Sequence, residues 1–370
     1  MFPWQSEVFA ELAQRLARGR LPHALLFAGP AGTGKRQFAR EFAHSLLCEQ
    51  RAADGTPCGT CASCRLLAAG THPDLHALRP PLLALAEGVA AEADADAAPD
   101  EDATGGEAAG SKTKASAEIS VAQIRALSES LSVAAHRGGL RVALVYPADA
   151  MNAIAANALL KTLEEPGERV VFLLVSDAPH RLLSTIRSRC QVVPMPIPER
   201  SVALAWLAEQ GSATDEQLAM VGGAPVRAAE LAATTYWQTH AALTQALAQG
   251  PQIDAVATAR LLETEIKRQD REAQTGTPRV VDLRVVISWL QRWMHDAIRA
   301  RLTQTIGYHR SAGDALDRVA SVPIARLMTF QAWLTDAARQ AGHPVNAQLF
   351  LEDSLLRYRA LFDANAKPAV

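Results

Sequence analysis

The feature that most constrains this chain is a glycine-rich stretch, GPAGTGKR, at residues 29–36. The apolar segment before it, LPHALLFAG (21–29), predicts a buried strand, and RQFAREFAHSLLC (36–48) after it has apolar residues at helical spacing. A strand, a glycine-rich turn and a helix in this order are the setting of the phosphate-binding loop G-x-x-x-x-G-K-[ST], whose backbone N–H groups surround phosphates. The candidate residues for binding ATP or ADP are Gly29, Gly32, Gly34 and Lys35.

Two positions around this loop lack the groups that a nucleotide hydrolase needs. The last position of the motif is Arg36, where a Ser or Thr hydroxyl would ligate Mg²⁺, and a guanidinium cannot ligate a cation. The strand predicted at 141–145 ends at Tyr146-Pro147, where two carboxylates would hold the metal and activate water. General acid–base help alone is worth about 10²–10⁴ in rate, so we expect hydrolysis to be absent or vestigial. Two interpretations of the loop stay open: it binds nucleotide without hydrolysing it, or it persists only as a tight strand-to-helix connection.

Four of the five cysteines lie close together, at Cys48, Cys58, Cys61 and Cys64, and Cys190 stands apart from them. Four thiolates at short spacing suit tetrahedral Zn²⁺, and four cysteine ligands leave no open position for a catalytic water. We therefore predict a structural zinc site. An iron–sulfur cluster and four unliganded buried thiols are the alternatives. Cys190 is predicted to be a core residue.

Strands and helices alternate up to about residue 195. After the loop come an expected helix at 119–136, a strand at 141–145, a helix at 150–165 and strands at 170–176 and 191–195. This alternation predicts an α/β domain with a parallel sheet covered on both faces. The stretch from Leu82 to Gly110 contains eight acidic residues and no basic ones, among mostly Ala and Gly, which predicts a disordered acidic insertion at about 80–117.

The composition changes after Pro194, Pro196 and Pro198, and the rest of the chain is helical almost throughout. Long amphipathic stretches lie at 253–268, 280–305, 315–341 and 345–363. We predict a small helical lid domain at 196–235 and an all-helical domain at 236–370. The TYWQTH block at 235–240 fits either side of that boundary.

The overall composition excludes some classes of partner. The formal net charge is only −2, and aromatic residues make up 5% of the chain, so a general polycationic or base-stacking surface for nucleic acid is not indicated. The N-terminal 20 residues predict a charged amphipathic helix instead of a signal segment. No run approaches the ~20 apolar residues that a membrane span needs. We expect a cytoplasmic protein without a membrane partner.

Four blocks of sequence together resemble a known family: HALLFAGPAGTGK (23–35), CGTCASCRLLAAGTHPDL (58–75), NALLKTLEEP (157–166) and STIRSRC (184–190). They resemble the bacterial clamp-loader ATPases of the AAA+ class, which include the gamma/tau and delta-prime subunits of DNA polymerase III. The resemblance is strong over residues 20–195. It implies a RecA-like AAA+ nucleotide-binding domain at 1–195 with a zinc module at about 45–75, followed by the helical lid and a helical oligomerisation (collar) domain.

The resemblance also implies roles for single residues. Cys48, Cys58, Cys61 and Cys64 correspond to the zinc ligands of the family's inserted module. Arg189 corresponds to the arginine of the Ser-Arg-Cys motif, which reaches into the ATP site of a neighbouring subunit. The NALLKTLEEP helix has a plain amphipathic pattern, and its Lys161, Glu164 and Glu165 are candidate interface contacts as well.

Departures from the family pattern indicate which type of member this chain is. Besides Arg36 and Tyr146-Pro147, the sensor arginine after the lid glycines aligns with Val226, and Arg227 lies one position away. These three losses favour the rigid, non-hydrolysing type, which acts in a hetero-pentamer with gamma/tau and delta subunits to load a sliding clamp onto primed DNA. An active ATPase subunit with unusual metal ligation is the alternative, and a free-standing zinc-dependent nucleic-acid binder is the weaker one.

Overall fold

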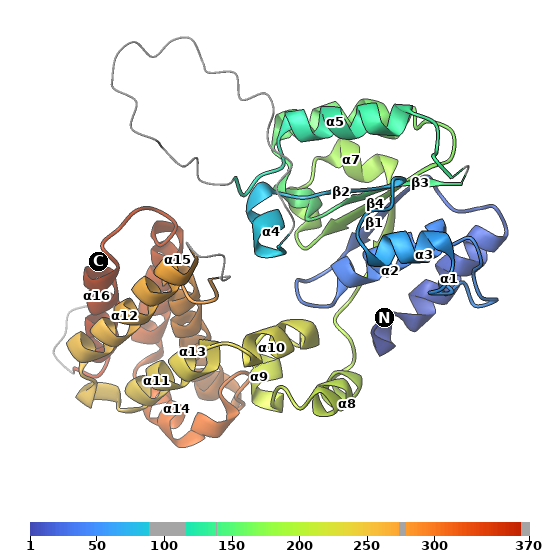
Figure 1. Cartoon of the computed structure of the whole chain (residues 1–370). Coiled ribbons are helices and arrows are strands. Elements are labelled where there is room, and N and C mark those ends of the chain that lie inside the picture. The colour runs from blue at the N-terminus through green and yellow to red at the C-terminus, as the bar shows by residue number, and fades with distance from the viewer. Residues whose placement is uncertain (89–115, 138, 274–278, 364–370) are drawn as a thin grey trace, which may run out of the picture. The chain divides into compact units, whose positions relative to one another are not determined.

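The computed structural model describes residues 1–88, 116–137, 139–273 and 279–363. The chain divides into two compact units, Met1–Val202 and Ala203–Val370 (Figure 1). The finer division into a lid at 196–235 and a collar at 236–370 stays a prediction.

The first unit is built on a five-stranded, fully parallel sheet, which confirms the predicted α/β class. The strand order is β2-β3-β4-β1-β5. The strands are β1 (Ala24–Ala28), β2 (Leu75–Leu78), β3 (Arg141–Val145), β4 (Val170–Ser176) and β5 (Gln191–Pro194). Every residue of β1, β3 and β4 is buried, as expected for central strands of a parallel sheet with both faces covered.

Helices cover both faces of this sheet, and alternate side chains of each strand pack on opposite faces. Leu25 and Phe27 of β1 pack with α1 (Ser6–Ala17) and α2 (Lys35–Leu47). Leu26 between them packs on the other face with α5 (Val121–Ser132), α6 (Ala153–Glu164) and α7 (Ser184–Arg189). Figure 1 shows α2 and α5 on opposite sides of the strands. Short 3₁₀ turns lie at Pro3–Gln5, Ala148–Ala150 and Pro179–Arg181.

Three short elements of this unit are absent from the sequence-based prediction: β2, α3 (Ala62–Ala68) and α4 (Pro81–Ala86). The helix α4 corrects the predicted start of the acidic insertion at about residue 80. Pro81 occupies the first turn of α4, where its missing N–H costs nothing, and the N–H of Leu82 donates to the carbonyl of Ser116 at 2.9 Å. Residues 89–115 of the predicted insertion lie outside the described residues.

The second unit is helical in its described parts. Its helices are α8 (Arg200–Gln210), which begins just before the boundary, α9 (Asp215–Met220), α10 (Pro225–Ala232), α11 (Tyr236–Ala248), α12 (Ala255–Ala273), α13 (Leu283–Thr303), α14 (Gly313–Ala320), α15 (Ile324–Gln340) and α16 (Ala347–Ala360), with 3₁₀ turns at Gly250–Gln252 and Arg310–Ala312. The amphipathic stretch at 315–341 is divided between α14 and α15 because Pro323 cannot continue a helix from Ser321. Among the helices described, none is both long and apolar enough to cross a membrane.

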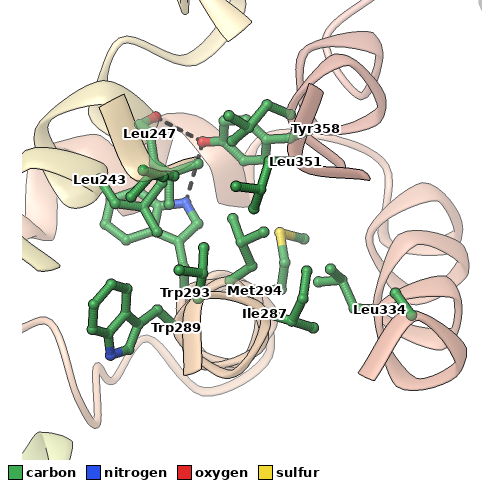
Figure 2. Close-up of a cluster of buried hydrophobic side chains, with 14 of the residues drawn as sticks. Leu243, Leu247, Ile287, Trp289, Trp293, Met294, Leu334, Leu351 and Tyr358 are labelled. Carbon is green, nitrogen blue, oxygen red and sulfur yellow. Dashed lines mark hydrogen bonds between the residues drawn. The ribbon is translucent and has the colours of Figure 1, made fainter. Parts of the chain in front are cut away.

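The large core of the second unit is organised around α13. Trp289, Trp293 and Met294 of this helix are buried and pack in one cluster with side chains of α11, α15 and α16 (Figure 2). Figure 2 also shows how the polar atoms in this core are satisfied: the indole N–H of Trp293 donates to the Tyr358 hydroxyl at 3.1 Å, and that hydroxyl donates to the Leu247 carbonyl at 2.8 Å. Buried Trp and Tyr side chains need such partners.

Candidate functional site

The carboxyl ends of all five strands meet at one edge of the sheet, and this is where parallel α/β sheets bind ligands. The glycine-rich loop leaves this edge at Gly29, directly after β1. Arg79, Tyr146 and Asp177 follow soon after the ends of β2, β3 and β4 at the same edge. The candidate nucleotide site therefore includes side chains from four strand ends.

Close packing explains why two positions of the loop must be glycine. A Cβ atom at Gly29 would lie 2.1 Å from the Met195 carbonyl oxygen. Gly34 has a φ of +84°, and a Cβ atom there would lie 2.3 Å from the ring of Phe2. Trp4 Nε1 and Gln5 Nε2 both donate to the carbonyl of Thr33 at 3.0 Å. The N-terminal turn is thus fixed directly against the loop.

The loop lysine is buried and already has an anionic partner. The side chain of Lys35 is only 2% exposed, and its Nζ lies 2.6 Å from Asp177 Oδ1 and also donates to the carbonyl of Pro30. Asp177 is held in turn by Asp149, whose Oδ1 accepts from the N–H of Asp177 at 3.2 Å and from Ser176 Oγ at 2.7 Å. Asp149 therefore orders the end of β4.

Next to the lysine, four side chains form what we call the Glu87 cluster: Arg36, Arg79, Glu87 and Tyr146. Glu87 Oε1 accepts from Arg36 at 2.5 Å, and Glu87 Oε2 accepts from Arg79 and from the Tyr146 hydroxyl at 2.9 Å each. Arg79 also donates to the Tyr146 hydroxyl at 2.5 Å, and both guanidinium groups lie 5.8 Å from the Tyr146 ring centre. Burial raises the pKa of Tyr146, which keeps the phenol neutral.

Two members of the Glu87 cluster, Arg36 and Tyr146, stand at sequence positions where a nucleotide hydrolase with this loop would bind Mg²⁺. Two guanidinium groups and a neutral phenol are not ligands for a hard cation, and both oxygens of Glu87 are engaged by these groups. The residues present therefore do not fit a magnesium site.

The four clustered cysteines come together at the end of α2 and the start of α3. Their sulfur atoms all lie within 4.8 Å of one another, with Cys48 and Cys61 4.0 Å apart and Cys58 and Cys64 3.9 Å apart. Tetrahedral zinc with Zn–S bonds of about 2.3 Å needs sulfur atoms about 3.8 Å apart, so the set fits a structural zinc ion.

Hydrogen bonds favour the thiolate form of Cys58, the form in which cysteine binds metal, whereas burial raises the pKa of the Cys64 thiol. The N–H groups of Cys58, Cys61 and Cys64 each donate to the sulfur of the preceding cysteine of the set at 3.3 Å. Hydrogen bonds, the strongest from the backbone of Thr60, lower the pKa of Cys58 to about 6. Cys190 is buried on the other face of the sheet, and its burial raises the pKa of that thiol to about 11, which confirms it as a core residue.

A chain of hydrogen bonds, buried at Ser63 and His72, joins the cysteine module to the sheet through the THPDL segment. The N–H of Asp74 donates to His72 Nδ1 at 3.1 Å, so Nε2 carries the proton and donates to Ser63 Oγ at 3.1 Å. Ser63 Oγ donates onward to Glu49 at 2.8 Å. Burial lowers the pKa of His72 and so favours this neutral ring. The carboxylate of Asp74 accepts from the N–H groups of His136 at 2.8 Å and Arg137 at 3.3 Å, so both the His and the Asp of this segment have structural roles.

Arg189 lies at the edge of the sheet opposite the loop. It ends α7 just before β5, and β5 runs parallel to β1 with Gln191 beside Leu25. The loop begins at the other end of β1, after Ala28. Arg189 is partly exposed, pairs with Glu164 at the end of α6, and donates to the carbonyl of Thr185 at 2.9 Å. Arg189 therefore lies at the end of the sheet away from the phosphate loop of its own chain.

Several residues of the loop edge carry no recognisable sequence motif. Arg79, Glu87 and Asp177 belong to no motif and are far from the loop in sequence. Arg79 and Asp177 could be found only from their positions directly after strands. For Arg79 even this fails, because β2 is too short to be recognised in the sequence. No sequence pattern around Trp4 indicates that it contacts the loop. Arg227, considered as a displaced sensor residue, lies on α10 and is 3.5 Å from Glu230.

Comparison with known proteins places these features in context. Residues 4–199 match the model of a family described as "DNA polymerase III, delta subunit". The chain is 32% identical to DNA polymerase III subunit delta' of Pseudomonas aeruginosa, with 98% of each chain covered. It is 32% identical to the Escherichia coli delta' subunit over 67% of this chain and 65% of the relative. It is 36% identical to the E. coli tau subunit over 50% of this chain and 23% of the relative.

Proposed function

This chain belongs to the DNA polymerase III delta-prime family of clamp-loader subunits, and from that premise we propose that it is a non-hydrolysing member that donates Arg189 to the ATP site of a neighbouring subunit. In this proposal it completes a hetero-pentamer with gamma/tau and delta subunits. The assembly opens the sliding clamp and places it on primed DNA. The zinc ion has a structural role only.

The observation that carries the proposal is the Glu87 cluster. Arg36 and Tyr146 replace groups that would bind the metal, and both engage Glu87. Without a metal and a base, the chain lacks two of the parts that phosphoryl transfer requires. A subunit with such a site still contributes to catalysis if it supplies a group to the site of its neighbour.

The position of Arg189 supports the donor role. An arginine that acts on a neighbouring site must lie away from the loop of its own chain, and Arg189 is at the opposite edge of the sheet. Its partner Glu164 is 49% exposed at the side chain, so water screens this ion pair. A phosphate in the adjoining site can therefore compete for the guanidinium.

Replacement of Arg189 tests the donor role in the reconstituted clamp-loader complex. Arg189→Ala should lower turnover by a factor of about 10³–10⁵ at the one site that it completes, because an arginine supplied in trans is worth that much. The measurements are DNA-stimulated ATPase and assembly by size-exclusion chromatography. Arg187→Ala, on the same helix, is the matched control. Unchanged DNA-stimulated turnover in an intact Arg189→Ala complex would remove the proposal.

A second candidate function is an active ATPase subunit with unusual metal ligation. The retained Lys35 and the left-handed backbone at Gly32 and Gly34 favour it. The purified chain would then hydrolyse ATP in the presence of Mg²⁺, and Lys35→Ala would abolish this activity. Turnover no faster than the buffer background excludes this candidate without affecting the first.

A further inference from the structure

We propose that a cavity at the amino ends of β2, β3 and β4 is a binding site for a small organic phosphate, which Arg51 and Arg137 hold. The cavity lies where the end of α2, the cysteine module and the segments before these three strands meet. The glycine-rich loop leaves the opposite edge of the sheet, at the carboxyl end of β1. The site is therefore separate from the candidate nucleotide site and goes beyond the proposed function.

The cavity is large enough for a small organic molecule. Its volume is about 370 Å³, and small-molecule sites in proteins have volumes of about 300–1,000 Å³. Leu46, Leu47 and Leu140 give part of its wall an apolar character. A ligand that has an apolar body as well as a charged group fits this lining better than a bare inorganic ion does.

The charged residues of the cavity favour an anion. Arg51, Arg137 and Arg169 bring three guanidinium groups to its lining, from the stretch after α2, the segment before β3 and the turn before β4. Glu49 and Asp74 are the carboxylates of the same lining, so its net charge is positive. A concave surface with an excess of one charge attracts ligands of the opposite charge.

The two carboxylates hold Arg137 in place. Asp74 is 3% exposed and accepts from the backbone N–H groups of His136 at 2.8 Å and Arg137 at 3.3 Å. Glu49 Oε1 accepts from Ser63 Oγ at 2.8 Å and from Arg137 Nε and Nη2 at 2.9 Å and 2.8 Å. Asp74 therefore fixes the backbone of Arg137 and Glu49 fixes its guanidinium group, so this cation is positioned before a ligand arrives.

Both arginines keep N–H donors for a ligand. Arg51 is anchored through Nη1, which donates to the carbonyls of Ser45 and Leu46 at 3.2 Å and 3.3 Å. Among the residues that the structure describes, no protein atom accepts from Arg51 Nε and Nη2 or from Arg137 Nη1. Guanidinium groups form charge-assisted, often bidentate hydrogen bonds with phosphate, which offers more acceptor oxygens than a carboxylate. The ligand class is therefore a phosphate ester.

Phenyl phosphate tests the proposal on the purified full-length chain, because it joins a phosphate to an apolar body. We expect it to bind more tightly than inorganic phosphate does, owing to the leucine wall. Arg51→Gln and Arg137→Gln should each weaken its binding by about tenfold or more, since hydrogen bonds to charged groups contribute that much. Titrations followed by phosphorus NMR measure the affinities. Arg125→Gln, which removes an exposed arginine on α5, is the matched control and should not change them.

Two further variants make the outcome decisive. Gly139 lines the cavity, and an added Cβ atom there would meet no atom within 4 Å, so Gly139→Leu adds bulk without disturbing a packed contact. It should weaken the binding of phenyl phosphate while both guanidinium groups stay in place, which covers the case in which Arg137→Gln disturbs the cysteine module. Lys35→Ala should bind phenyl phosphate as the wild type does, because Lys35 belongs to the loop at the other edge of the sheet.

The phosphate can belong to a free small molecule or to the end of a DNA strand, and an oligonucleotide with a terminal phosphate distinguishes these sources. If it binds and Arg51→Gln weakens it, the ligand is a strand end; if only phenyl phosphate binds, the ligand is a free phosphate ester.

Three results would overturn the proposal. They are binding of phenyl phosphate to the wild type that is absent or no tighter than that of inorganic phosphate, equal affinities for wild type, Arg51→Gln, Arg137→Gln and Gly139→Leu, and loss of binding in Lys35→Ala. None of these measurements involves ATP turnover by a complex, so their outcome is independent of the test of Arg189.

Discussion

The side chain at position 36 shows how one residue changes the chemistry of a loop. A Ser or Thr hydroxyl at this place ligates Mg²⁺, whereas Arg36 brings a positive charge and pairs with Glu87. Tyr146 makes a similar change at the end of β3, because a buried neutral phenol replaces a carboxylate. These two residues convert a place suited to a cation into one that favours anions.

A second residue-scale feature lies in the core of the helical unit, where His240 is buried among aromatic rings. Its ring stacks on His309 with centres 5.3 Å apart and meets Trp289 edge-on. In the part of the chain that the structure describes, His240 Nε2 has no hydrogen-bond partner. Burial, with smaller contributions from His309 and Arg292, lowers the pKa of His240 to about 3 from an ordinary 6.5.

This lowered pKa predicts that acid destabilises the folded state. The folded chain keeps His240 neutral while the unfolded chain protonates it, so its contribution to stability is complete above pH 6.5 and is lost as the pH falls towards 3. His240→Phe keeps an aromatic ring and cannot protonate. We expect the free energy of unfolding of this variant to fall less steeply with acid, by up to about 1.4 kcal/mol per pH unit. Urea denaturation between pH 7 and pH 4 measures the slopes.

The exposed His343 supplies the control for this prediction. His343→Gln should keep the pH dependence of the wild type, since that side chain is exposed in both states. Equal slopes for wild type and His240→Phe would show that the buried ring does not set the acid sensitivity.

At the scale of elements, the cysteine module illustrates how short segments are stabilised. It consists of the end of α2, an irregular stretch and the seven-residue α3, with little apolar surface of its own. A metal ion bound by the four sulfur atoms would crosslink these segments and so do the work of a core. The hydrogen bonds from Glu49 through Ser63 to His72 then attach the module to the sheet.

Loss of one ligand should therefore release both the metal and the module. Cys61→Ser removes a buried sulfur that also caps the first turn of α3 by accepting from the N–H of Cys64. We expect zinc content to fall from one ion per chain towards zero, with rapid proteolysis between residues 49 and 61. Elemental analysis and limited trypsin digestion measure these effects.

Cys190→Ala is the control, because it removes a thiol that lies outside the module and should retain one zinc per chain. Full zinc occupancy in Cys61→Ser would exclude the four-cysteine site. Iron and sulfide in place of zinc would favour the iron–sulfur alternative.

At the scale of the whole molecule, the two units have separate hydrophobic cores. The sheet of the first unit is covered on both faces by its own helices, and the core around α13 is built from residues of the second unit alone. Damage to one core should therefore leave the other folded, so that unfolding proceeds in two steps.

Leu290 offers a test of this independence. It is fully buried in α13, and Leu290→Ala should cost about 2–5 kcal/mol, confined to the second unit. Calorimetry should show a lower transition for the helical unit, while the unit that contains the parallel sheet melts as in the wild type. Leu302→Ala, on the same helix but 67% exposed, should change stability by less than about 0.5 kcal/mol. A single transition shifted as a whole in Leu290→Ala would show that the units unfold together.

Sequence patterns predicted the long elements of both units better than the short ones. The strands β1, β3 and β4 are buried apolar runs, and such runs are visible without a structure. The strand β2 has only four residues, with one buried, and α4 has six residues inside an acidic stretch. Elements of this length depend on their neighbours for stability, so their sequences carry little periodicity.

The sequence by itself determined the loop, the parallel α/β class, the four-cysteine set and the absence of metal-binding groups at Arg36 and Tyr146. These features are local, since the residues that define each of them lie close together in the chain. Only the tertiary structure decided which side chains surround Arg36 and Tyr146. Arg36 and its partner Glu87 are 51 residues apart in the sequence, and Tyr146 and its partner Arg79 are 67 apart. In a parallel sheet the carboxyl ends of all strands lie at one edge. This arrangement brings Asp177 beside Lys35 and Glu87 beside Arg36.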